Sequence, residues 1–127
     1  MKRALSRAFD PPAPMVPVHL RAPDGLDTAE VEAKVDTGAD LCAVPERLIA
    51  ELDLPPVREV RAAGFAGVLQ QVPVYRVDIL LDGDWLKQIE ALATRRAYAI
   101  LGRNVLRHFV IRIDGPKGQL EIKRPRR

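Results

Sequence analysis

Apolar and polar residues alternate along most of the chain, as expected for strands with one buried face. Val16, Val18 and Leu20 alternate with residues on the opposite face, and 29–35 repeats the pattern after the turn signal 22–25. Further apolar segments predict strands at 41–44, 57–63, 68–74, 75–81, 85–93, 99–101, 109–113 and 120–122. Strands separated by turn signals every eight to twelve residues or so are typical of a small closed β-barrel. We therefore predict an all-β, barrel-like domain.

Two short segments depart from the strand pattern and predict helices. Pro45 and Glu46 begin the first, and Leu48, Ile49 and Leu52 have the spacing of one helical face. The second is expected near 103–108.

The strand that ends at Val35 leads directly into Asp36-Thr37-Gly38-Ala39. The strand before Asp36 and the glycine turn after it restrict where this carboxylate points, which makes Asp36 a candidate catalytic residue. An Asp-Thr-Gly sequence is also ordinary turn chemistry, in which Asp and Thr side chains cap backbone amides and Gly takes a positive φ. The turn alone leaves both interpretations open.

A second motif follows 66 positions after Asp36, where the apolar strand 99–101 ends at Gly102 and continues as Arg103-Asn104-Val105-Leu106. The two motifs, in this order and at this separation, resemble those of the retropepsin-like aspartic proteases, the single-domain family that includes the retroviral proteases. The resemblance extends from about Val16 to Leu120. It implies a retropepsin fold and an aspartic endopeptidase that hydrolyses polypeptides.

Peptide hydrolysis by carboxylates needs two of them, one ionised and one protonated. The chain has one Asp-Thr-Gly, so the resemblance implies a two-fold homodimer in which Asp36 of both subunits forms the catalytic dyad. Thr37 would then hydrogen-bond across the dimer, Gly38 and Ala39 would support the turn, and Gly102 would pack behind it. Arg103 pairs with acidic residues in retroviral relatives, but the sequence does not identify its partner here. Because the nucleophile is water, we expect no metal and no organic cofactor.

Gly64-Phe65-Ala66-Gly67 lies at the tip of a hairpin predicted from 57–63 and 68–74. In the family this is the place of the flap, the hairpin that closes over bound peptide, and we assign these four residues to substrate binding. The alternative is that both glycines only permit the turn and Phe65 packs locally.

The 127 residues suffice for one core. We predict a flexible lead-in at 1–13, the protease domain at 14–123 and a basic tail at 124–127. No apolar run could span a bilayer, and the residues after Met1 lack the apolar core of a secretory signal, so we expect a cytoplasmic protein without membrane contact.

Other candidate chemistry is sparse. Cys42 is the single cysteine, and without a nearby basic partner we interpret it as a buried apolar residue; His19 and His108 are interpreted as structural. Two alternatives to the protease remain. The fold could be a peptide-binding or dimerisation module without catalysis, or the basic ends could bind nucleic acid, which we do not expect with only six aromatic residues.

Overall fold

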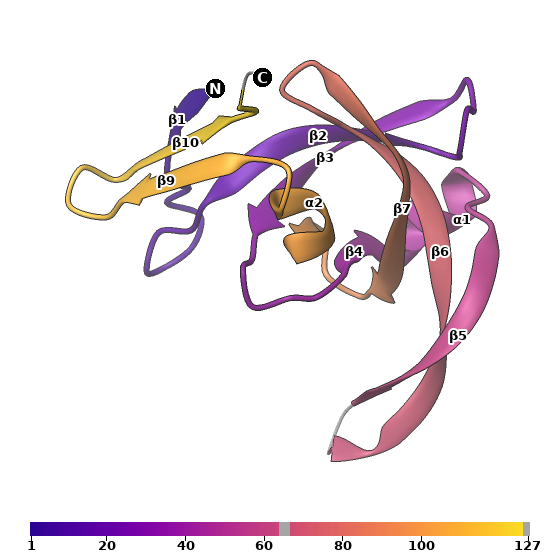
Figure 1. Cartoon of the computed structure of the whole chain (residues 1–127). Coiled ribbons are helices and arrows are strands. Elements are labelled where there is room, and N and C mark those ends of the chain that lie inside the picture. The colour runs from indigo at the N-terminus through magenta and orange to yellow at the C-terminus, as the bar shows by residue number, and fades with distance from the viewer. Residues whose placement is uncertain (64–66, 126–127) are drawn as a thin grey trace.

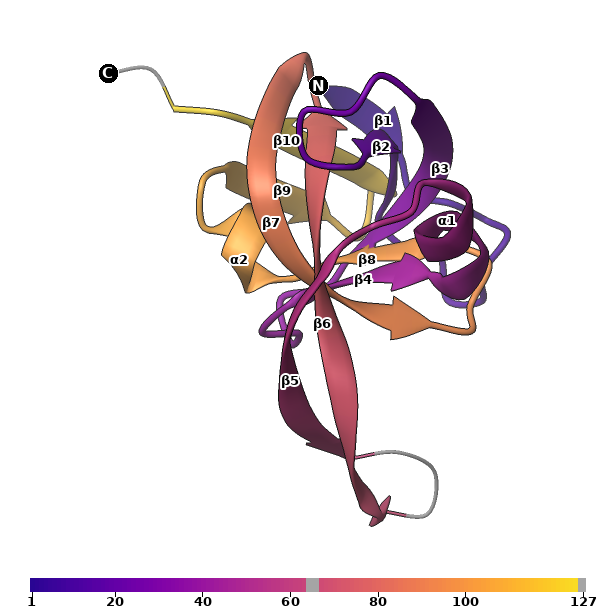
Figure 2. The same cartoon turned by 90° about the vertical axis from the view of Figure 1, so that its right-hand side faces the viewer.

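The structure is a computed structural model that describes residues 1–63 and 67–125 (Figures 1 and 2). The strands in chain order are β1 Lys2–Ala4, β2 Met15–Arg21, β3 Thr28–Val35, β4 Cys42–Pro45, β5 Pro56–Ala63, β6 Leu69–Leu81, β7 Asp84–Thr94, β8 Ala99–Leu101, β9 Val110–Asp114 and β10 Gln119–Lys123. The two helices are α1 Glu46–Glu51 and α2 Arg103–Leu106. Neither is long and apolar enough to cross a membrane.

Seven strands form the main sheet in the order β2-β3-β8-β4-β7-β6-β5. An additional pairing of β2 with β6 closes the first six into a barrel, and β5 extends outward as the partner of β6 (Figure 1). The β3–β8 and β4–β7 pairs are parallel, and the other pairs of this sheet are antiparallel. The predicted all-β, barrel-like fold with two short helices is confirmed.

The apolar residues of the alternating strands fill the barrel. Val16, Val18 and Leu20 of β2 are each at most 1% exposed, and α1 and α2 close the core with Leu48, Val105 and Leu106. Burying such side chains contributes roughly 1.5–3 kcal/mol each. The alternation seen in the sequence therefore corresponds to the burial that holds the barrel together.

A second sheet has the order β1-β10-β9. Its first strand corrects our expectation of a flexible lead-in, because Lys2–Ala4 pairs with 119–121 of β10 and the Met1 amino group donates a 2.6 Å hydrogen bond to the Ile122 carbonyl. Three residues are too few for an alternating pattern, so the sequence contains no sign of this strand. At the other end, Arg124 forms a 3.7 Å ion pair with Asp84.

Strand β6 is also longer than expected. We predicted separate strands at 68–74 and 75–81, but Leu69–Leu81 forms one strand that pairs with β5 in its first half and with β7 in its second half. Pro73 is accommodated because it lies at the half paired only with the outer strand β5, opposite Glu59.

The inner half of β6 carries a charged residue in the core. The Asp78 side chain is 0% exposed and accepts hydrogen bonds from Arg21 Nε (2.9 Å) and from the backbone amides of Asp24 (2.9 Å) and Gln88 (2.8 Å). The Arg21 guanidinium also lies 3.9 Å from the centroid of the Trp85 ring. Burial acts to raise the pKa of Asp78, but these donors outweigh it and hold the pKa below its ordinary value. Asp78 thus ties β6 to β2, β7 and the turn after β2.

Candidate active site

Asp36 follows directly on β3 and is held by a strand from much later in the chain. Val35 pairs with Leu101 of β8, and the next amide, that of Asp36, donates a 3.1 Å hydrogen bond to the Leu101 carbonyl. The backbone of Asp36 is therefore fixed on both sides, by β3 before it and by β8 beside it.

Within the turn, the Gly38 amide donates a 2.9 Å hydrogen bond to Asp36 Oδ1, and the Ala39 amide donates to the Asp36 carbonyl at 3.2 Å. Asp36 is half-buried, whereas Thr37 and Gly38 are exposed. Gly38 is not among the glycines with positive φ; a Cβ at this position would lie 3.2 Å from Asp36 Oδ1, so the absent side chain leaves room around the carboxylate. One carboxylate oxygen is thus oriented by an amide while the turn faces solvent.

Gly102 packs behind this turn. A Cβ on Gly102 would lie 2.5 Å from both the carbonyl carbon and oxygen of Leu41, and 3.0 Å from the Ala39 carbonyl oxygen. These are backbone atoms, which cannot swing aside as a flexible side chain can. The close approach therefore requires glycine.

Arg103 connects α2 to the same turn. Its Nη1 donates a 2.7 Å hydrogen bond to the Thr37 carbonyl, its Nη2 forms an ion pair with Asp40, and its backbone amide donates to the Ala39 carbonyl at 2.8 Å. The partner of Arg103, Asp40, was not predicted from the sequence. An acidic residue four positions after Asp36 and a basic residue directly after Gly102 were the available signs.

Asn104 was also absent from the predicted site. Its Oδ1 accepts hydrogen bonds from the Cys42 amide (3.1 Å) and thiol (3.2 Å), and its Nδ2 donates to the Glu90 carbonyl at 2.8 Å. Asn104 therefore links α2 to β4 and β7 beneath the Asp36 turn. Burial raises the pKa of the Cys42 thiol to about 12, so this cysteine is neutral near pH 7 and acts as packing.

Both histidines are at least partly exposed to solvent. His19 lies 3.5 Å from Glu30 on the exposed side of the β2–β3 pair, and His108 is exposed after α2. Among residues 1–63 and 67–125, no three His, Cys, Asp or Glu side chains gather where they could hold a metal ion.

The hairpin of β5 and β6 extends away from the barrel (Figures 1 and 2). Gly64, Phe65 and Ala66 of the predicted substrate-binding tip lie outside the described residues. Gly67 has a φ of +71°, which favours glycine, and a Cβ there would meet no atom within 4 Å.

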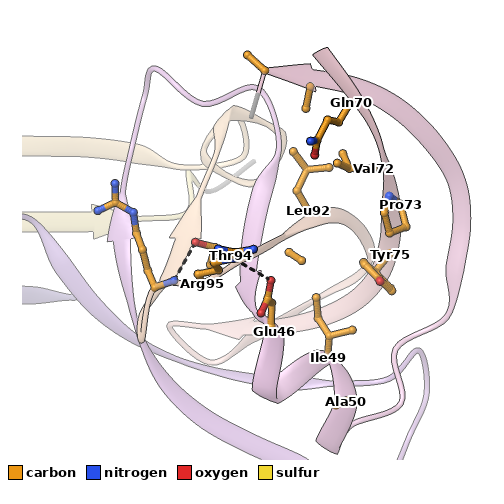
Figure 3. A pocket seen from close by; sticks show the side chains of 14 residues that line it. Glu46, Ile49, Ala50, Gln70, Val72, Pro73, Tyr75, Leu92, Thr94 and Arg95 are labelled. Carbon is orange, nitrogen blue, oxygen red and sulfur yellow. Dashed lines mark hydrogen bonds and ion pairs between the residues drawn. The ribbon is translucent and has the colours of Figure 1, made fainter. Parts of the chain in front are cut away.

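An open pocket of about 880 Å³ lies between this hairpin, α1 and the end of β7 (Figure 3). Ile49, Val72, Tyr75 and Leu92 supply apolar surface. At its edge, Arg95 Nε lies 3.9 Å from Glu46 Oε1. A volume of this size is in the range of ligand-binding clefts.

A family model described as aspartyl protease matches residues 22–105. No curated protein sequence matches the chain.

Three solved structures share the fold. A retropepsin-like aspartic protease from Rickettsia conorii is 18% identical with a TM-score of 0.63, over 94% of this chain and 86% of that one. EIAV protease in complex with an inhibitor is 24% identical with a TM-score of 0.50, over 75% of this chain and 86% of that one. The foamy viral protease-reverse transcriptase is 19% identical with a TM-score of 0.57; 75% of this chain is covered, but only 12% of that much longer chain.

Proposed function

Since this chain belongs to the aspartyl protease family and has the retropepsin-like fold, we propose that it is an aspartic endopeptidase whose active site forms between two copies of the chain. The observation that carries the proposal is the Asp36 turn. Its carboxylate is oriented by the Gly38 amide, its backbone is fixed by β8, and it stays partly open to solvent.

In the proposed mechanism the two Asp36 carboxylates share one proton, because two like charges at close range cannot both remain ionised. The ionised carboxylate takes a proton from a water molecule, whose oxygen attacks the scissile carbonyl carbon, while the protonated carboxyl donates its proton to the carbonyl oxygen. The tetrahedral intermediate then collapses: the C–N bond breaks, the amine nitrogen receives a proton from one carboxyl, and a hydroxyl of the intermediate gives its proton to the other carboxylate, which restores the single shared proton of the dyad. Thr37 and Gly38 are both exposed on the turn and would meet the partner turn in the dimer, and Gly102 would keep the turn in place from behind.

The outer edge of β9 is our candidate for a second contact between the copies. β9 is the last strand of its sheet, and Val110 and Ile113 are 48% and 49% exposed. Exposed strand edges with apolar side chains favour pairing with another chain. If two β9 strands paired antiparallel about a two-fold axis at Ile113, Arg112 of each copy would face Asp114 of the partner subunit. This register places opposite charges together on both sides of the axis.

The substrate would be an extended polypeptide lying between the β5–β6 hairpin and the Asp36 turns, with backbone hydrogen bonds to the hairpin. The apolar pocket beside the hairpin would accept an apolar substrate side chain, and Glu46 and Arg95 would face its polar edge.

The decisive experiment compares cleavage of a denatured protein by the wild type and by Asp36→Asn, from acidic to neutral pH, at concentrations that favour dimers. Asp27→Asn, an exposed aspartate in the loop between β2 and β3, is the matched control. We expect cleavage by the wild type and the control, and none by folded Asp36→Asn. Folded dimers of the wild type that bind peptides but cut none would favour the non-catalytic binding module instead.

The β9 register is tested separately by sedimentation equilibrium. Arg112→Asp and Asp114→Arg should each weaken dimerisation, and the double exchange should restore it, because only the pair regains opposite charges. If the double variant dimerises no more tightly than either single variant, the proposed register is wrong, while the Asp36 assignment is unaffected.

A further inference from the structure

The segment that precedes the barrel forms a closed loop rather than a free tail. The Ser6 amide donates a 2.7 Å hydrogen bond to the Ala13 carbonyl, and the Ala13 amide returns a 3.0 Å bond to the Ser6 carbonyl. Ala13 is buried at the base of the loop. The loop, residues 6–13, therefore has a fixed attachment from which it presents Phe9.

Phe9 contacts Tyr98, the residue directly before β8. The two rings meet edge to face, with centroids 5.4 Å apart and planes at 82°. Lys34 of β3 places its Nζ 5.3 Å from the centroid of the Phe9 ring. Edge-to-face pairs of this kind are favourable beyond the area that they bury, so the contact holds Tyr98 from the side of the N-terminal loop.

Tyr98 is in turn connected to the wall of the pocket. Arg96 Nη1 donates a hydrogen bond to Tyr98 Oη, and the guanidinium lies 5.6 Å from the centroid of that ring. The Arg96 amide also donates a 3.2 Å hydrogen bond to Thr94 Oγ1, and both Thr94 and Arg96 line the pocket. A continuous series of contacts thus runs from Phe9 through Tyr98 and Arg96 to the pocket.

We infer that the N-terminal loop is a specificity element: through Phe9 and Tyr98 it positions residues 94–96, which line the pocket, and so determines which substrate side chain fits. This rests on the proposed function and extends it to residues outside the barrel. Phe9 is a positioning residue, since it acts through Tyr98 and Arg96. The Asp36 turn is held by Leu101 and Arg103, at the opposite end of β8 from Tyr98, so moving the wall leaves the dyad in place.

The test compares Phe9→Ala with Phe9→Tyr, which keeps the ring, and with Leu26→Ala, which removes a side chain that is 98% exposed at the β2–β3 loop. Cleavage sites in a denatured protein are mapped by mass spectrometry, and kcat and KM are measured on one peptide that the wild type cuts. For Phe9→Ala we expect KM to rise about three- to tenfold, the factor that one aromatic pair provides, with kcat changed less than about twofold and a broader range of residues at the cleavage sites. Phe9→Tyr should restore the wild-type values, and Leu26→Ala should not change them.

Amide NMR signals supply a readout that does not depend on cleavage. Phe9→Ala should shift the signals of 94–98 and leave those of 36–39 unchanged. The inference would be overturned if Phe9→Ala left the cleavage profile unchanged or left the 94–98 signals unchanged. It would also be overturned if Phe9→Ala unfolded the protein, so that kcat fell as much as KM rose. Failure of the proposed function is distinct, because then the wild type itself cuts nothing.

Discussion

The Asp36 turn leads from β3 to β4, on either side of β8, whereas the β5–β6 hairpin joins two paired strands, and the two are held in different ways. The Asp36 amide donates to the Leu101 carbonyl and the Thr37 carbonyl accepts from Arg103, about 65 positions later, and Gly102 packs against the turn from behind. The outer part of the hairpin is held by its own ladder, with Arg61 opposite Gln71 and Ala63 opposite Leu69. Its side chains there are mostly exposed.

The difference corresponds to the two proposed roles. A carboxylate that must face its counterpart across a dimer needs a fixed direction, and contacts from several distant segments provide it. A cover for bound peptide needs register along its own strands but few contacts with the barrel. Elements with few buried contacts are those that open at the lowest free energy.

The largest expected effect comes from adding a methyl group behind the fixed turn. Gly102→Ala would place its Cβ 2.5 Å from the Leu41 backbone, so the turn must shift. We expect a loss of about 3 kcal/mol in the free energy of unfolding and the disappearance of cleavage. Urea denaturation and the cleavage assay measure both.

Gly115→Ala is the matched control, because a Cβ there meets no atom within 4 Å and φ is not positive. If Gly102→Ala is as stable and active as this control, the turn is less constrained than its contacts indicate.

The second effect concerns the anchored half of β6. Asp78→Asn removes the charge that pairs with Arg21, and we expect a loss of about 2 kcal/mol at pH 7. The pKa of Asp78 is held below its ordinary value of 3.8. The extra free energy of unfolding that the wild type has over Asp78→Asn is therefore fully present above that pH. It is lost as the pH falls through the lower pKa of the folded state.

Denaturation of both proteins at pH 7 and in steps below pH 3.8 checks this sign, with Asp27→Asn as the exposed-carboxylate control. A difference between wild type and Asp78→Asn that stays constant into strong acid would contradict the assignment of Asp78 as a charged anchor.

A smaller and local effect is expected in the hairpin. Gly67→Ala places a side chain at a φ of +71°, and this strained backbone conformation raises the free energy of the folded hairpin by about 1 kcal/mol. We expect hydrogen exchange to increase for the outer β5–β6 amides, while those around Asp36 remain protected. Equal changes in both regions would show that hairpin and turn are coupled.

The smallest effect is expected from Asp40→Asn. Both partners of the Asp40–Arg103 ion pair are exposed, at 82% and 55%, and such pairs contribute about 0.5 kcal/mol. The Arg103 hydrogen bond to the Thr37 carbonyl would remain and keep the turn oriented. A stability loss in Asp40→Asn comparable to that of Gly102→Ala would mean that the ion pair, not the packing, fixes the turn.

The sequence was sufficient to predict a structural feature where a local pattern has only one physical explanation. Alternation at β2 and β3 indicated buried faces, and the Asp36 and Gly102 motifs marked two segments that the structure brings together. Strand β1 was missed because three residues show no period. Continuity of β6 was missed because Pro73 suggests a break, and only the change of partner along the strand explains why it is tolerated.

The side-chain partners could not be predicted for a different reason. Asp78 bonds to Arg21, Asp24 and Gln88, from two other parts of the chain, and Arg103 pairs with Asp40. Asp78 and Arg103 each have many possible hydrogen-bond and ion-pair partners along the sequence. Only the strand order and register select among them.

Strand β8, three residues placed between β3 and β4, has a consequence for the order in which the protein becomes functional during synthesis. At about 5–20 residues per second, roughly 3 to 13 s separate translation of Asp36 from translation of Gly102. Until then the Asp36 amide has no Leu101 carbonyl to bind and the turn has no backing. A nascent chain therefore carries the Asp36 carboxylate in an unassembled turn until β8 has been synthesised and has paired with β3.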